Sequence, residues 1–175
     1  MLDLAAGSGR HTRLLLEAGF TVCAVDRDIS ELLPFAGGRC EVRRVDLESD
    51  AARPLGSDYE GIVITNYLHR RLLPSIARAL GRGAILIYET FAVGNQRFGR
   101  PRNPDFLLRP GELLEAFAML TPIAFEQGET AVPRPAVIQR LAAVAGPLGR
   151  LPVATDLDLP LPAEQSPACQ MLPKR

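Results

Sequence analysis

The first 28 residues contain the pattern that most restricts how this chain can fold. An apolar segment, Leu2–Ala5, leads into a loop of small residues at 6–9. A helix is predicted at Arg10–Glu17, because Leu14, Leu15 and Ala18 are spaced to lie on one side of it. A second apolar segment, Thr21–Val25, ends at Asp26. Strand, glycine loop, helix, strand and acid follow in the order of a nucleotide-binding βαβ unit. We therefore predict that a nucleotide-like ligand binds over the loop, where backbone N–H groups at the helix start are free.

Two classes of ligand use such a unit, and the spacing of its glycines distinguishes them. A dinucleotide site has the pattern G-x-G-x-x-G, in which the third glycine lets the helix pack closely on the strand. Here Gly7 and Gly9 supply the first two glycines, but Thr12 takes the third position. The incomplete pattern argues against an NAD-dependent oxidoreductase without excluding it.

With Asp3 included, the stretch resembles motif I of the class I S-adenosylmethionine-dependent methyltransferases, D/E-x-G-x-G-x-G. Asp3 matches the acid, and Ala5 stands where the first glycine would be. Gly7 and Gly9 match the other two glycines. The resemblance implies that the loop backbone cradles the methionine part of S-adenosylmethionine and that Asp26 binds the ribose hydroxyls. An ordinary strand–helix turn with a solvated Asp26 is the alternative.

Hydrophobic patterning continues the alternation of strands and helices as far as residue 145. Further strands are predicted at 41–45, 62–65, 84–88, 121–126 and 136–145, and helices at 29–33, 72–80 and 110–118. The tight connection between the last two strands favours antiparallel pairing. The resemblance implies a Rossmann-like α/β methyltransferase fold: a mostly parallel seven-stranded sheet with a C-terminal antiparallel hairpin and helices on both faces. Residues 111–129 look loosely like the tellurite and thiopurine methyltransferase-like group, which methylates small acceptors.

Residues at the ends of later strands complete the expected cofactor site. Asp46 and Leu47 follow the third predicted strand, and the resemblance implies that the acid meets the adenine amino group while the leucine packs on the ring. A helix cap or a solvated loop acid is the alternative for Asp46. We also assign Arg27 and Asn66, which follow the second and fourth strands, to the cofactor. The predicted cofactor-binding set is Asp3, Ala5, Gly7, Gly9, Asp26, Arg27, Asp46, Leu47 and Asn66.

The candidate catalytic residues follow the fourth strand. Methyl transfer from a sulfonium needs positioning, a dry pocket and, for a protonated acceptor, a base. His69 lies beyond the strand end where an open α/β sheet places its ligand, and histidine is a common general base. Tyr67 is placed to line the methyl group or to stack on the acceptor. A local hydrogen bond for His69 and ordinary packing for Tyr67 are the alternatives, and His11 is interpreted as structural or close to the methionine carboxylate.

The longest irregular stretch, residues 92–109, contains four arginines and two phenylalanines. A loop of this length is usually a lid, a binding segment or disordered. Guanidinium groups bind carboxylates and other oxyanions through paired N–H donors. We predict that Arg97 and Arg100 bind an anionic acceptor, and a solvated loop is the alternative.

Composition restricts the remaining possibilities. Twenty Lys and Arg residues balance 20 Asp and Glu residues, so no net charge draws the chain to nucleic acid or to an anionic membrane. The sequence shows neither a signal peptide nor an apolar run of the roughly 20 residues that a membrane span needs. Cys23, Cys40 and Cys169 are too scattered for a metal site. We expect a cytoplasmic, metal-free protein with a small-molecule substrate and no nucleic-acid partner, in an oligomeric state that the sequence leaves open.

The predicted domain boundary lies at residue 146. Residues 1–146 form the expected S-adenosylmethionine-binding domain, and residues 147–175 a proline-rich tail, extended or disordered. Met1 directly precedes the first strand, whereas the resembled family usually has N-terminal helices, so we expect those helices to be absent. The hypothesis is a methyltransferase acting on a small molecule, with an anionic acceptor as its narrower form. The alternatives are an S-adenosylmethionine-binding protein without catalysis, truncated or regulatory, and, less favoured, the oxidoreductase.

Overall fold

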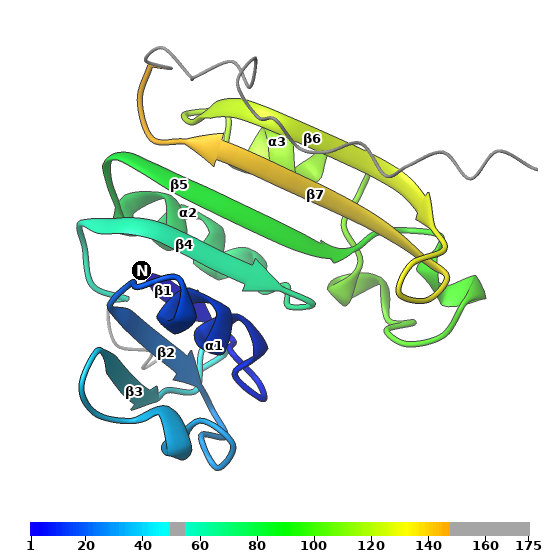
Figure 1. Cartoon of the computed structure of the whole chain (residues 1–175). Helices are drawn as coiled ribbons and strands as arrows, with labels where there is room; N and C mark the ends of the chain where they lie inside the picture. Colours follow the sequence, from blue (N-terminus) through cyan, green and yellow to red (C-terminus); the bar gives the residue numbers. More distant parts are fainter. Residues whose placement is uncertain (50–54, 148–175) are drawn as a thin grey trace, which may run out of the picture.

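A seven-stranded sheet in the order β3-β2-β1-β4-β5-β7-β6 forms the centre of the molecule (Figure 1). The computed structural model describes residues 1–49 and 55–147. The predicted tail, 147–175, therefore lies outside the described residues from position 148 onward. The strands are β1 (Leu2–Leu4), β2 (Val22–Asp26), β3 (Cys40–Arg44), β4 (Tyr59–Thr65), β5 (Leu80–Phe91), β6 (Thr121–Thr130) and β7 (Ala136–Val144).

The pairing of the strands confirms the predicted fold class. The five strands from β3 to β5 run parallel, whereas β7 is antiparallel to β5 and β6 is antiparallel to β7. In β4, Ile62, Val63 and Ile64 are all buried, as expected for a parallel strand covered on both faces. The order reverses between β1 and β4, so the loops that follow these two strands diverge and leave room for a ligand.

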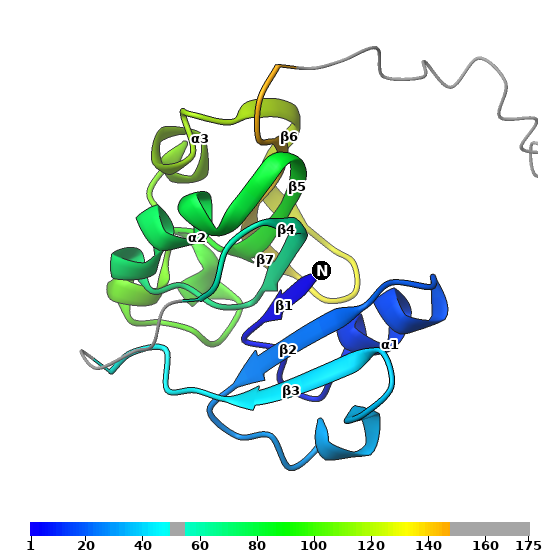
Figure 2. The ribbon, with the colours of Figure 1, turned by 90° about the vertical axis from the view of Figure 1, so that its left-hand side faces the viewer.

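Helices cover both faces of the sheet, as predicted (Figure 2). On one face, α1 (Arg10–Glu17) and the 3-10 helix η1 (Leu33–Phe35) pack against alternate residues of β2. On the other face lie α2 (Leu73–Ala79) and α3 (Glu112–Ala116), which contribute to the larger core cluster. The helical turn predicted at 29–33 begins later than expected, at Leu33, and includes Pro34, which is well suited to an early helical position.

Two segments are more ordered than the sequence indicated. The Gly-Arg-Gly sequence at 81–83, which lies between the predicted helix at 72–80 and the predicted strand at 84–88, belongs to β5. This strand begins at Leu80 and pairs there with Tyr59. Residues 92–109, predicted as irregular, contain the 3-10 helices η3 (Asn95–Arg97) and η4 (Pro104–Phe106). Leu107 and Leu108 are buried, and Val93 N–H donates to the Leu108 carbonyl. The segment is thus anchored to the core at its C-terminal end.

Candidate functional site

A cavity of about 500 Å³ lies over the carboxyl ends of β1, β2, β3 and β4. This volume lies within the range of pockets that bind small molecules and cofactors. The lining residues fall in five segments: 5–8, 10–11, 26–27, 45–48 and 65–67. Eight of the predicted site residues line this first cavity: Ala5, Gly7, Asp26, Arg27, Asp46, Leu47 and Asn66 of the predicted cofactor-binding set, and the catalytic candidate Tyr67.

The Asp26 carboxylate is fixed against the glycine loop. Its Oδ2 accepts a hydrogen bond from the Gly7 N–H at 2.8 Å, and its Oδ1 accepts one from the Asp28 N–H at 3.0 Å. Each carboxylate oxygen can accept two hydrogen bonds, so both retain accepting capacity toward the cavity. A ligand with two neighbouring hydroxyl groups could be held by this carboxylate.

Asp3 is part of the motif but does not line the first cavity. It is 2% exposed, and its Oδ2 accepts a hydrogen bond from the Thr12 hydroxyl at 2.6 Å. Burial raises the pKa of Asp3, while the hydrogen bond from Thr12 works in the opposite direction. The pair joins β1 to the first turn of α1, so Asp3 supports the loop from beneath. Thr12, in place of a third glycine, is the donor that this buried acid needs.

Gly9 also has a packing role and lies outside the cavity lining. Its φ is 78°, in the left-handed region, and a Cβ built there would come within 2.6 Å of the Phe35 ring. The glycine therefore permits close packing between the loop and η1.

Two residues at the cavity have left-handed backbone conformations without being glycine. Ala5, directly after β1, has φ 57°, and Asn66, directly after β4, has φ 56°. Such conformations cost an ordinary L-residue on the order of 1 kcal/mol and often occur at functional sites. Both lie where parallel strands give way to the loops of the cavity.

Tyr67 has a buried hydroxyl without a hydrogen-bond partner in the described part of the chain. Burial is the main reason that its pKa is raised, and the neighbouring carboxylates of Glu48 and Asp46 raise it further. The hydroxyl therefore remains protonated, and a polar ligand in the first cavity would supply the partner that it lacks.

A second cavity, of about 390 Å³, adjoins the first. The ends of β4 and β5, the start of β7 and the connection from β6 to β7 surround it. It shares Arg10, His11, Thr65 and Asn66 with the first cavity. Its other lining residues are Glu89, Phe91, Thr130, Val132, Pro133, Arg134, Ala136, Ile138 and Arg140.

His11 is the histidine that lies between the two cavities, where its Nδ1 is 3.4 Å from the Thr65 hydroxyl. His69 lines neither cavity and occupies the cap position before the 3-10 helix η2 (Arg70–Leu72). His11 was not among the catalytic candidates predicted from the sequence. Its place in the first turn of α1, directly after the glycine loop, was the sequence feature that could have indicated a position at the site.

Arg97 and Arg100 line neither cavity. Arg97 pairs with Glu129 of β6, and its guanidinium lies 5.2 Å from the centre of the Phe98 ring. Their assignment to an anionic acceptor therefore stays a prediction, which neither of the two cavities supports. The arginines that do line the second cavity, Arg134 and Arg140, come from a part of the chain that the sequence analysis interpreted only as strand and turn.

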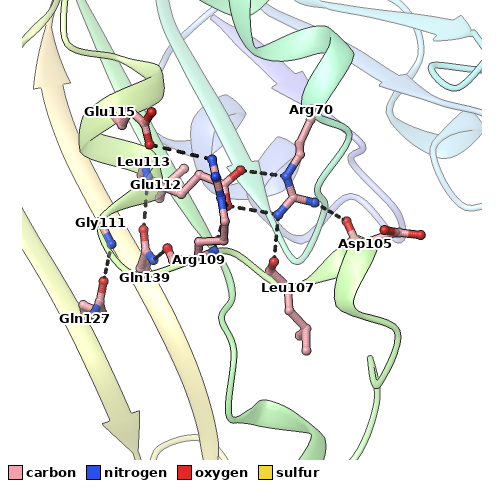
Figure 3. A network of polar contacts seen from close by, with 10 residues as sticks. All are labelled: Arg70, Asp105, Leu107, Arg109, Gly111, Glu112, Leu113, Glu115, Gln127 and Gln139. Atoms are coloured by element: carbon pink, nitrogen blue, oxygen red, sulfur yellow. Dashed lines mark hydrogen bonds and ion pairs between the residues drawn. The ribbon is translucent and has the colours of Figure 1, made fainter.

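An ion pair between the half-exposed Arg70 and the buried Glu112 holds the segment that follows Tyr67 (Figure 3). Arg70 donates to both carboxylate oxygens of Glu112, at 2.7 and 3.0 Å, and also to the carbonyls of Asp105 and Leu107. Burial works to raise the pKa of Glu112, but the hydrogen bonds from Arg70 and the Arg109 N–H outweigh it and hold that pKa below its usual value. The network joins the chain after β4 to the start of α3.

The described residues give no sign of a metal or a membrane span. Among residues 1–49 and 55–147, no three His, Cys, Asp or Glu side chains gather as metal ligands. No helix within these ranges is long and apolar enough to cross a membrane.

No protein-family profile and no curated protein matches this chain, but many solved structures share its fold. TehB from Haemophilus influenzae superposes with a TM-score of 0.68 at 15% identity, over 83% of this chain and 57% of TehB. A second similar structure is the 1,6-didemethyltoxoflavin-N1-methyltransferase of Burkholderia thailandensis, solved with 1,6-didemethyltoxoflavin and S-adenosylhomocysteine bound. It superposes with a TM-score of 0.60 at 23% identity, over 82% of this chain and 69% of the methyltransferase. The [4+2]-cyclase SpnF superposes with a TM-score of 0.63 at 15% identity, over 85% of this chain and 74% of SpnF. The chain thus has the Rossmann-like fold of the class I methyltransferases.

Proposed function

We propose that the protein transfers a methyl group from S-adenosylmethionine to a small-molecule acceptor. The observation that carries the proposal is the Asp26 carboxylate, hydrogen-bonded to the glycine loop and facing the first cavity. Methyltransferases among the proteins of similar fold support it, one of them acting on a small heterocycle. The cyclase of the same fold is a reminder that fold does not decide activity, so the proposal depends on the residues of the site.

The residues of the first cavity fit the parts of the cofactor. The Asp26 carboxylate would accept hydrogen bonds from the ribose hydroxyls, and the Asp46 carboxylate would accept one from the adenine amino group. The buried Leu47 would pack on the adenine ring. Free N–H groups at the start of α1 would face the methionine carboxylate. The unpartnered Tyr67 hydroxyl would gain a hydrogen-bond acceptor from the cofactor.

The second cavity would hold the acceptor, because it meets the first at His11 and Thr65. When bound, S-adenosylmethionine supplies an activated methyl group on a sulfonium. His11 would take the proton from the acceptor atom, and the Thr65 hydroxyl would orient the imidazole through Nδ1. Phe91 and Ile138 supply apolar surface that keeps water from the reacting groups.

The NAD-dependent alternative is disfavoured by Thr12. The third glycine of a dinucleotide site lets the helix pack closely on the strand, whereas here a full side chain fills that place and bonds to Asp3. Binding without catalysis is distinguished from the proposal by turnover of S-adenosylmethionine with a panel of small acceptors.

The proposal is tested by calorimetry with S-adenosylmethionine, S-adenosylhomocysteine and NADH. We expect Asp26→Ala to weaken binding of both sulfur compounds about tenfold or more, since hydrogen bonds to a charged group contribute roughly 1.5–3 kcal/mol. Asp28→Ala is the matched control, because Asp28 is an exposed acid outside the cavity lining. Thermal melting checks that both variants fold. Tighter binding of NADH, or unchanged affinity in a folded Asp26→Ala variant, would overturn the proposal.

A further inference from the structure

We propose that the second cavity recognises an acceptor with an oxyanion group, a carboxylate or a phosphate, joined to an apolar body, and that Arg134 is the residue that binds the oxyanion. The inference rests on the proposed function, because it takes the second cavity as the acceptor site. It moves recognition of the anion from the segment at 92–109 to the connection between β6 and β7.

The charges around the second cavity favour an anion. Arg140 is already balanced, since its guanidinium donates to Glu89 and to Glu126 on the two neighbouring strands. Arg10 and Arg134 also line the cavity, and neither makes an ion pair with another described residue. Among the residues that line this cavity, three guanidinium groups stand against one carboxylate, that of Glu89, because Glu126, the second partner of Arg140, does not line it.

Arg134 is more specific to the second cavity than Arg10 is. Arg10 lines both cavities, so its charge also acts on a ligand in the first. Arg134 lines the second cavity alone and is exposed, which leaves its side chain free to adjust to a ligand. A guanidinium presents paired N–H donors that match two oxygens of a carboxylate or phosphate.

Part of the cavity wall is apolar. Phe91, Ala136 and Ile138 belong to one buried cluster, and Val132 and Pro133 stand beside them in the cavity lining. An acceptor with an aromatic or aliphatic body would cover these side chains. Its oxyanion would then lie toward Arg134 and its reactive atom toward His11 and Thr65, where the cavities meet.

The test is binding of matched acids and amides by calorimetry to protein saturated with S-adenosylhomocysteine. The probes are hydroxy-, amino- and mercaptobenzoates, their primary amides, and the corresponding phenyl phosphates, which separate carboxylate from phosphate recognition. We expect at least one acid or phosphate to bind tenfold or more tightly than its neutral partner. Arg134→Ala should remove that preference while leaving the affinity for S-adenosylhomocysteine within twofold.

Arg82→Ala is the matched control, since Arg82 is an exposed arginine of β5 that lines neither cavity. It should keep the preference for acids. Equal binding of acids and amides, binding of no acid or phosphate of the panel, or an Arg134→Ala variant that keeps the preference would overturn this inference alone. Failure of the parent protein to bind S-adenosylhomocysteine would overturn the proposed function and this inference together.

Discussion

The Thr12 hydroxyl donates a hydrogen bond to the Asp3 carboxylate at 2.6 Å, and both side chains are buried beneath the glycine loop. A buried carboxylate without a donor is costly because it loses its hydration without compensation. The contact therefore explains how an acid is tolerated inside β1, and it joins α1 to β1 in addition to the apolar packing of α1 on β2.

We expect Thr12→Val to lower the free energy of unfolding by about 1–3 kcal/mol, because it keeps the shape but leaves Asp3 without this donor. Thr12→Ser keeps the donor and should cost only about 1 kcal/mol for the lost methyl group. Urea denaturation measures both. Equal losses in the two variants would show that the hydroxyl contributes nothing.

The pH dependence of the same pair has a definite sign. The pKa of Asp3 is raised in the folded state, so the folded protein binds this proton more tightly than the unfolded chain and the cost of the buried charge falls on acidification. Removal of the Thr12 donor raises that pKa further. The difference in stability between the parent and Thr12→Val should therefore narrow as the pH is lowered from neutrality.

The conformation of Ala5 gives a second prediction. Its φ of 57° is strained for alanine by roughly 1–2 kcal/mol, whereas glycine adopts it freely at an entropic cost of about 0.4–1 kcal/mol. We expect Ala5→Gly to be neutral or to stabilise the protein by up to about 1 kcal/mol. Ala6→Gly, at a position without positive φ, should destabilise it by about 0.4–1 kcal/mol. Thermal and urea denaturation compare the two, and similar losses in both would contradict the argument.

The Arg70–Glu112 pair gives a third prediction. Glu112→Gln removes the charge from a side chain that is 5% exposed, so we expect a loss of about 1.5–3 kcal/mol near neutral pH. Because the pKa of Glu112 is lowered in the folded state, its contribution is present above the ordinary glutamate pKa. That contribution is lost as the pH falls from there through the folded value. The difference in the free energy of unfolding between the parent and Glu112→Gln should therefore narrow as the pH falls through that range.

Glu115→Gln is the control for this pair. Glu115 is 76% exposed and lies 3.7 Å from Arg109, so its loss should change stability by no more than about 0.5 kcal/mol at any pH. Denaturation curves recorded between neutral and acidic pH measure all three proteins. A Glu112→Gln variant as stable as Glu115→Gln would mean that the network in Figure 3 adds little to folding.

Local patterns explain which parts of the fold and site could be predicted. Gly7 and Asp26 were found because a strand, a loop and a helix that are adjacent in sequence bring them together. Ala5 was identified as standing in a glycine's place, and its positive φ gives that substitution a physical meaning. The strand pattern also gave the sheet, since β4 is a continuous apolar run and the last two strands are closely connected.

Tertiary contacts explain what could not be predicted. The second cavity joins the first turn of α1 to the connection before β7, and no short motif links His11 to Arg134. Arg97 was interpreted as available, but its partner Glu129 lies on a strand that only the folded chain brings near. The early start of β5 likewise depends on a neighbouring strand, because Leu80 pairs with Tyr59 of β4 and the strand then includes Gly81 and Gly83.

The two histidines give the last prediction, which concerns catalysis. His11 lies where the cavities meet, so His11→Gln should lower kcat about a hundredfold or more for an acceptor that must lose a proton. The acidic limb of the pH profile of kcat should disappear in this variant, because glutamine cannot take up the proton. The affinity for S-adenosylhomocysteine, measured by calorimetry, should change little, since in the proposed function Asp26 and the glycine loop bind that ligand.

His69→Gln is the informative comparison, because His69 was the base predicted from the sequence but lines neither cavity. We expect its kcat to remain within a few-fold of the parent and its pH profile to keep the acidic limb. If His69→Gln loses the limb and His11→Gln keeps it, the base is His69 and the segment after β4 must move toward the acceptor. If both variants keep it, the acceptor atom reacts without a protein base, as an acceptor already ionised in solution would.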